Sequence, residues 1–89
     1  MAFLNRRWMS PVLLAAGRGA GRFGTFRRMV PGISDRMLSV RLKELESRRL
    51  IRREVIPTTP VQVLYHLTER GRALLEVATS MARWAYADM

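Results

Sequence analysis

One stretch of the chain, residues 34–49, carries side chains that could contact the edges of nucleic-acid bases. If the stretch is a helix with 100° between residues, an apolar face and a mostly polar face lie opposite each other. The apolar face holds Leu38, Leu42 and Leu45, and the opposite face holds Arg36, Ser39, Val40 and Lys43. Arg and Lys bind guanine edges, and an apolar side chain can meet a thymine methyl group. The pattern predicts a base-contacting face, and its alternative is an ordinary solvated surface.

The sequence offers no set of residues for disulfides, metal binding or catalysis. The chain has no cysteine and one histidine, His66, which excludes disulfides, thiolate metal sites and multi-histidine metal sites. Asp35, Glu44 and Glu46 stand among arginines without a nucleophile or metal partner, so they do not form a catalytic pair. His66 fits a surface or capping position better than a pH sensor, because a switch needs a bistable partner. We predict no enzyme activity, no metal and no cofactor.

The distribution of charge indicates a polyanionic partner. The net charge is +9, and residues 1–53 hold 13 basic and 3 acidic side chains, against 3 basic and 4 acidic in residues 54–89. Such asymmetry favours one surface that faces a polyanion. Every basic residue except Lys43 is Arg, which suits bidentate phosphate and guanine contacts. A GC-rich genome would also favour Arg over Lys, but it does not explain the asymmetry.

The elements before this stretch are short. Ser10 and Pro11 suit a helix start, and Gly17 suits its end. The GRGAG segment that follows is interpreted as a connector, because a phosphate cradle would need a preceding strand. Arg22 and Phe23 are expected to form a short piece of strand. A second helix is expected from Gly24 or Thr25 to Met29 or Val30, and the turn PGIS joins it to residues 34–49.

The elements after this stretch complete a winged helix-turn-helix. Ser34 is the expected N-cap of the third helix, which runs to about Arg49. IRREVI and VQVLYHL predict a two-stranded wing around the turn PTTP, and Thr68 then caps a final helix. The predicted fold class is α+β, mainly α, with three N-terminal helices, a two-stranded wing and a C-terminal helix. Residues 1–89 are expected to form one domain.

The final helix, residues 68–87, is expected to serve both the core and a dimer. Its apolar residues recur at helical spacing and include Leu74, Val77, Met81 and Trp84. Part of this stripe should close the core, and the surplus should pack on a partner chain. The tryptophans and tyrosines are interpreted as core and interface residues rather than as a ligand cage.

The N-terminal sequence gives little sign of export or membrane insertion. The apolar run from Val12 to Ala16 is too short for a signal peptide, and no cleavage site follows it before more Arg. No window approaches the roughly 18 apolar residues that a membrane span needs. A soluble, cytoplasmic protein is therefore expected.

Four segments occur in an order and spacing that resemble one family. RRWMSPVLL places a Trp before an apolar helix, and RFGTFRRMVPGIS enters the helix-turn-helix. LSVRLKELESRRLIRREV matches the recognition helix and first strand, and YHLTERGRALL matches the end of the wing and the last helix. From about Trp8 to Trp84, the chain resembles the HxlR-type winged helix-turn-helix transcription regulators of bacteria and archaea.

The resemblance implies a homodimer that binds double-stranded DNA at an inverted-repeat operator. The recognition-helix positions that match are Ser34, Asp35, Arg36, Ser39, Val40 and Lys43. Arg41 matches a position where the family often has Arg, and its expected role is phosphate contact or pairing with Glu44 or Glu46. Further DNA contacts are expected from Arg27, Arg28, Arg52, Arg53, Thr58, Thr59 and Gln62. Because a strand alternates its faces, Arg52 and Arg53 cannot both face one surface.

Three departures from the family pattern alter these expectations. Only seven residues precede Trp8, so most of the family's N-terminal dimer helix is absent. The dimer interface is then expected to rest on Leu74, Leu75, Ala78, Met81, Trp84 and Ala85. The family's sensing Cys is absent, which excludes thiol-based sensing, and no small-molecule effector is identified. The wing tip is neutral, so its DNA contact should be weak.

The leading hypothesis is a sequence-specific transcriptional regulator that acts as a homodimer. Two alternatives stay open. One is a winged-helix protein-interaction module, in which the arginines are incidental. The other is a non-specific DNA-binding architectural protein.

Overall fold

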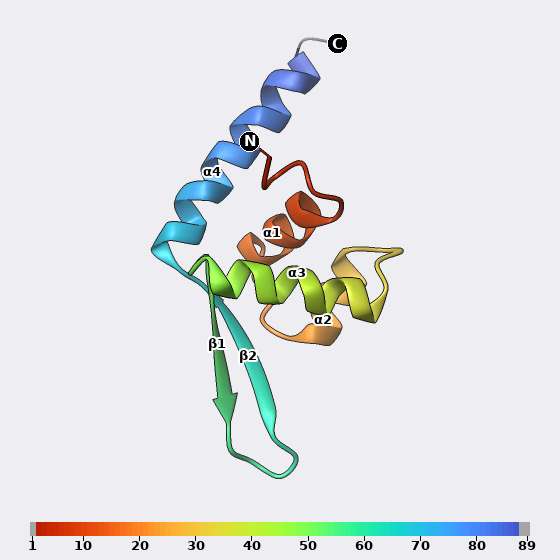
Figure 1. The fold of residues 1–89 in the computed structure, drawn as a ribbon, viewed down its shortest axis with the longest axis vertical. Coiled ribbons are helices and arrows are strands. Elements are labelled where there is room, and N and C mark those ends of the chain that lie inside the picture. The colour runs from red at the N-terminus through yellow and green to blue at the C-terminus, as the bar shows by residue number, and fades with distance from the viewer. Residues whose placement is uncertain (1, 88–89) are drawn as a thin grey trace.

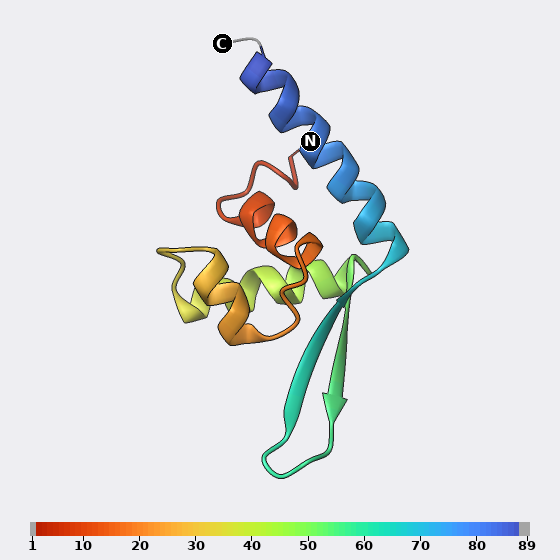
Figure 2. The same cartoon turned by 180° about the vertical axis from the view of Figure 1, so that it is seen from behind.

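The computed structural model describes residues 2–87 as four helices and one two-stranded antiparallel sheet (Figure 1). The elements in chain order are α1 (Met9–Gly17), α2 (Phe23–Met29), α3 (Asp35–Ser47), β1 (Ile51–Ile56), β2 (Gln62–Leu67) and α4 (Glu69–Ala87). The first three helices form the body of the molecule, the hairpin extends from one end of it, and α4 extends from the other (Figures 1 and 2). This is the winged helix-turn-helix arrangement that the sequence predicts.

The core lies between the three N-terminal helices. Val12 and Leu13 of α1, Phe26 of α2 and Leu38 of α3 are completely buried. Leu42 and Leu45 are also buried, as their spacing predicts. Burial of one such Leu side chain contributes about 1.5–3 kcal/mol, so this stripe holds α3 firmly against the body.

The boundaries of α3 follow from local chemistry. The Ser34 side chain accepts a hydrogen bond from the Met37 N–H at 3.1 Å, which is the expected N-cap. At the other end, Arg49 has a φ of 59°, and the Leu50 N–H donates to the Leu45 carbonyl at 2.9 Å. A left-handed residue with this bond is a Schellman ending, which turns the chain directly into β1.

The wing is a regular hairpin. β1 and β2 pair from Ile51↔Leu67 to Ile56↔Gln62, close to the strands that the sequence predicts. The base of the wing is fixed to the body, because the Tyr65 N–H donates to the Gly21 carbonyl at 2.8 Å. The Tyr65 ring also meets Phe26 edge to face, with 6.0 Å between centroids. The GRGAG connector therefore supports the wing.

Helix α4 is attached to the body mainly through its first half. Thr68 caps it as predicted, since its hydroxyl oxygen accepts a hydrogen bond from the Gly71 N–H at 3.0 Å. Gly71 lies so close to the wing base that an added Cβ would stand 2.0 Å from the Leu50 carbonyl oxygen. The second half of α4 projects beyond the body (Figure 2).

Two local predictions are wrong. Helix α1 begins at Met9 with Trp8 at the N-cap, and the Ser10 hydroxyl instead donates to the Leu4 carbonyl at 3.1 Å. Arg22 is extended, but Phe23 already belongs to α2, so no strand forms there. In both places, packing of an aromatic residue overrides the local signal, because Trp8 and Phe23 both pack against the core.

Candidate nucleic-acid interface

The helix-turn-helix is built by α2, the turn and α3. Gly32 in the turn has a φ of 91°, a backbone conformation that glycine adopts without strain. The guanidinium of Arg27 pairs with the Asp35 carboxylate at 2.8 Å, which links the end of α2 to the first turn of α3. Both side chains are more than half exposed, so the pair fixes geometry more than it adds stability.

The face of α3 opposite its leucines lies open to solvent. Arg36, Ser39, Val40 and Lys43 are all exposed, and Val40 exposes 40% of its surface. An exposed Val among polar residues on a helix is suited to a thymine methyl group. The structure thus brings together the four side chains that the sequence singles out as base readers.

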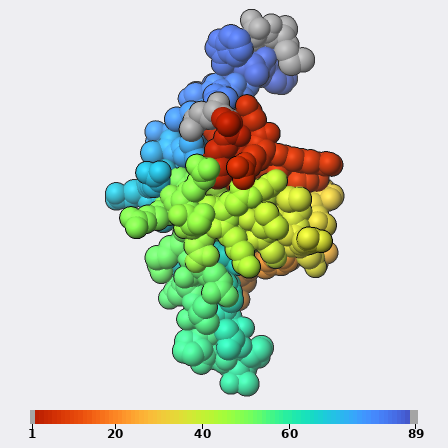
Figure 3. All heavy atoms as spheres, in the orientation of Figure 1, coloured from red at the N-terminus to blue at the C-terminus, as the bar shows by residue number. Residues whose placement is uncertain are grey.

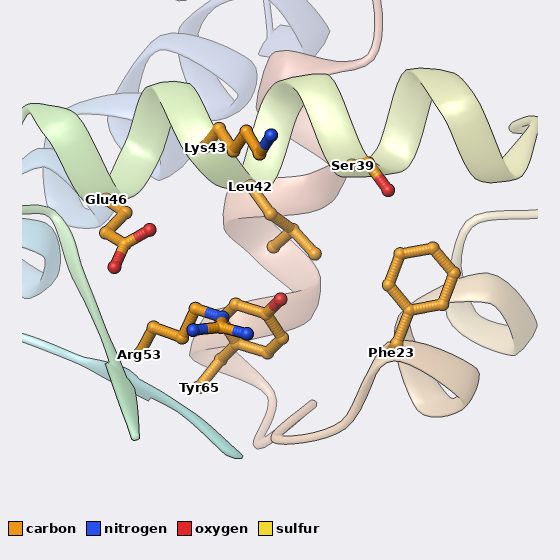
Figure 4. A pocket seen from close by; sticks show the side chains of 7 residues that line it. All are labelled: Phe23, Ser39, Leu42, Lys43, Glu46, Arg53 and Tyr65. Carbon is orange, nitrogen blue, oxygen red and sulfur yellow. The ribbon is translucent and has the colours of Figure 1, made fainter. Parts of the chain in front are cut away.

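A notch of about 400 Å³ separates α3 from the wing (Figure 4). Its lining comes from α2, α3 and the two strands of the wing and consists of Phe23, Ser39, Leu42, Lys43, Glu46, Arg53 and Tyr65. Lys43 and Arg53 supply positive charge, and Ser39 and Tyr65 supply hydroxyl groups. This combination is suited to a phosphate group, while Glu46 adds a negative charge at the same place.

The two arginines at the wing base differ in their surroundings. Arg53 lines the notch beside α3, whereas Arg52 does not. Both arginines line a second hollow at the wing base, together with Arg49 and Thr68. Of the two, only Arg53 lies in the notch beside the exposed face of α3.

Two side chains at the wing tip already form hydrogen bonds within the chain. The Thr58 hydroxyl donates to the Pro60 carbonyl at 2.8 Å. The Gln62 side-chain oxygen accepts a hydrogen bond from the Arg22 guanidinium at 3.0 Å, which links the start of β2 to the start of α2. Thr59 is exposed. The sequence missed the role of Arg22, which could be found only once the hairpin is placed beside α2.

The residues expected at a dimer interface fall into two groups. Leu74, Leu75 and Ala78 pack at least partly against the chain's own core. Met81, Trp84 and Ala85 are exposed, and Trp84 exposes 70% of its surface. The described residues thus leave the outer half of α4 with an uncovered apolar side.

Arg41 has a role that the sequence anticipated only in part. It pairs with Glu44, one of the two carboxylates considered for it. Its Nε also donates to the Arg7 carbonyl at 2.8 Å, and Arg6 pairs with the same Glu44 carboxylate at 2.8 Å. The links to Arg6 and Arg7 span 38 and 34 residues, so no local pattern signals them.

The fold defines the class of protein as a winged helix-turn-helix protein with one exposed helix face. The sequence model of the HxlR-like helix-turn-helix family matches residues 3–89. The chain belongs to that family, as its motifs predict.

Related proteins agree with this assignment. The HTH-type transcriptional regulator YodB of Bacillus subtilis (strain 168) is 42% identical over 84 residues, which cover 94% of this chain and 75% of YodB. YvaP, another HTH-type transcriptional regulator of that organism, is 39% identical over 82 residues, covering 92% of this chain and 76% of YvaP.

Solved structures match the fold closely. The reduced form of YodB has a TM-score of 0.84 at 42% identity, covering 94% of this chain and 82% of that one. The reduced form of the redox regulator HypR has a TM-score of 0.87 at 34% identity, covering 98% and 86%. Within residues 2–87, no helix has the length and apolarity to cross a membrane.

Proposed function

We propose that this regulator binds an inverted-repeat operator as a homodimer, with α3 of each subunit in the DNA major groove. The observation that carries the proposal is the open face of α3 beside a notch that holds Lys43 and Arg53. A helix of this kind fits the major groove, and the half-sites of a dimer lie roughly 34 Å apart.

Base reading is assigned to the exposed face of α3. Arg36 and Lys43 offer donors to guanine, Ser39 is a donor or acceptor, and Val40 offers an apolar contact. Ser34 and Asp35 form the start of the helix, where the N-cap and the Arg27 pair hold the first turn in place. This turn enters the groove first in a recognition helix.

Phosphate contacts are assigned to the basic residues around that face. Arg27 and Arg28 lie in the last turn of α2, and Arg53 lies in the notch. Arg52 lies beside Arg53 in the second hollow at the wing base and is assigned a further phosphate contact. Such contacts fix the register of the protein on DNA without reading its sequence.

The wing tip is assigned a minor role. It contributes Thr58, Thr59 and Gln62 and no positive charge. Thr58 and Gln62 already have partners within the chain, so each would exchange one hydrogen bond for another. We infer weak, sequence-independent contacts here.

The dimer is assigned to α4, and residues 1–89 are treated as one domain. The exposed Met81 and Trp84 continue the apolar side that begins with Leu74, Leu75 and Ala78. At 100° per residue, Leu74, Ala78, Met81 and Ala85 share one side of the helix, with Leu75 and Trp84 on its two flanks. Packing against a second copy would remove the exposed part of this surface from water. YodB and HypR structures include reduced and oxidant-treated forms, but these 89 residues contain no cysteine for such chemistry.

The test is selection of bound sequences from a random pool of duplex DNA at near-physiological salt. The proposal expects enrichment of an inverted repeat whose half-sites are one helical turn apart. Retention without a common sequence would favour a non-specific DNA-binding protein. No retention would contradict the proposal and favour a protein-interaction role.

A further inference from the structure

The N-terminal arm, residues 5–8, lies along α3 although more than 30 residues separate them in sequence. Figure 3 shows the N-terminal residues in red directly against the green and yellow surface of α3. The arm precedes α1 and contributes no element of the helix-turn-helix itself. Its contacts with α3 therefore need an explanation of their own.

Glu44 is the centre of these contacts. Its carboxylate accepts from Arg6 Nη1 at 2.8 Å and from Arg41 Nη1. Arg41 in turn donates from Nε to the Arg7 carbonyl at 2.8 Å. The Arg41 and Glu44 side chains are only 13% and 22% exposed, so solvent screens their interaction less than it screens a surface pair.

The end of the arm reaches the turn before α3. Trp8 has a φ of 73°, and its ring lies 3.5 Å from the place where a Cβ on Gly32 would stand. The Arg7 guanidinium stacks over the Trp8 ring at 5.2 Å from the centroid. The arm therefore touches α3 near its middle and also the turn that leads into it.

These contacts lie on the flank of α3, between its buried and its DNA-facing sides. The leucine stripe holds α3 against the body. A helix held only by one apolar stripe can rotate about its long axis more easily than a helix that is also anchored along one flank. A small roll would shift the base-reading side chains, and misplacement by about 1 Å is enough to weaken a positioned contact.

We propose that Glu44 is a positioning residue that fixes the roll of α3 through the N-terminal arm. Glu44 acts through Arg6 and Arg41 and makes no contact with DNA. The role rests on the proposed DNA-binding function, because it concerns the aim of the same helix. The effect belongs to sequence preference more than to general affinity for DNA.

This inference and simple electrostatics predict opposite results for Glu44→Gln. Removal of a negative charge close to DNA should strengthen binding to any sequence. If Glu44 positions α3, the loss of its partly buried, charged contacts with the arm should instead weaken binding to the selected operator by about threefold to tenfold. Affinity for a scrambled duplex should stay the same or rise.

The matched control is Glu76→Gln. Glu76 is exposed on α4, outside α3 and the wing, and forms no ion pair within residues 2–87. The substitution changes the net charge by the same amount but leaves the arm in place. We expect this variant to bind operator and scrambled DNA as tightly as the wild type or slightly more tightly, with no loss of preference.

The double variant Arg6→Gln with Glu44→Gln separates the loss of the ion pair from a change in net charge. One positive and one negative charge are lost, so the net charge stays at +9. The loss of operator preference should persist in this variant. If Glu44→Gln and Glu76→Gln behave alike, or the double variant regains full preference, the positioning role is overturned.

Hydrogen exchange of the free protein separates this inference from the proposed function. In Glu44→Gln, amides of residues 5–9 and of α3 should exchange faster, while those of the wing should not change. Unchanged exchange in α3 would overturn the inference, whether or not the wild type binds DNA. A wild type that binds no duplex would overturn the proposed function, and faster exchange in α3 would still support the arm as its anchor.

Discussion

Helices α3 and α4 use their apolar residues in opposite ways. In α3, Leu38, Leu42 and Leu45 are all at most 2% exposed, and the exposed side is largely polar. In α4, Gly71 and Ala78 are the buried residues, while Val77, Met81 and Trp84 remain 43–70% exposed. The apolar residues of α3 are buried within their own chain, whereas the outer half of α4 still has an exposed apolar surface.

Under the proposed function, this difference corresponds to two tasks within one small chain. A helix that reads DNA must be held rigidly by its own body, because its side chains have to reach fixed positions. A helix that joins two subunits keeps its apolar side for the partner. Substitutions in α3 should therefore act on folding or on sequence preference, and substitutions in outer α4 should act on association.

The largest effect is expected from Leu42→Ala in α3. Leu42 is 2% exposed, and its truncation leaves a cavity between helices that cannot easily close. The free energy of unfolding should fall by about 2–5 kcal/mol, as measured by urea denaturation. Val40→Ala on the same helix is the control, and its exposed position predicts a change within about 0.5 kcal/mol. Equal losses would contradict the division of α3 into a buried and a free side.

A smaller loss is expected from Gly71→Ala, which tests how α4 is attached. Helix propensity alone predicts stabilisation by about 1 kcal/mol. The added Cβ would stand 2.0 Å from the Leu50 carbonyl oxygen, so the contact should prevail and cost about 1–3 kcal/mol. Thermal melts of the two variants would measure the effect, and Gly24→Ala in α2, whose added Cβ meets nothing closer than 3.8 Å, should show no loss. A stabilised Gly71→Ala would contradict the close junction.

Trp84→Ala should leave the folded monomer almost unchanged and weaken association. Trp84 is 70% exposed, so the change in unfolding free energy should stay within about 0.5 kcal/mol. Loss of an aromatic anchor should raise the dimer dissociation constant by about tenfold or more in analytical ultracentrifugation. Arg83→Ala is the control, since at 100° per residue it lies opposite Met81 and Ala85. An equal effect of both variants would argue against the proposed face.

Local signals in the sequence were sufficient for much of the fold. Ser34 and Thr68 are capping residues followed by helical patterns, and both caps form. The strands were visible in β-branched residues on either side of PTTP, and the buried face of α3 was visible in its leucine spacing. Each of these features depends on residues a few positions apart.

The features that could not be predicted depend on distant contacts. Ser10 is an equally good local cap, but Trp8 packs against the core and starts the helix at Met9, so the Ser10 hydroxyl donates to the Leu4 carbonyl instead. The brace of Arg6 on Glu44 and the bond from Arg22 to Gln62 span 38 and 40 residues. No periodicity reports such pairs, since they exist only after the elements have packed.

The central claim is that the open face of α3 reads the DNA sequence. The most direct test is the double variant Arg36→Ala with Lys43→Ala, compared with Arg18→Ala with Arg72→Ala, which removes the same charge from exposed positions outside α3 and the wing. Affinities for the selected operator and for a scrambled duplex would be measured at fixed salt. We expect the first variant to lose at least about tenfold of the operator preference and the second to keep it. An unchanged preference in the first variant would contradict the account.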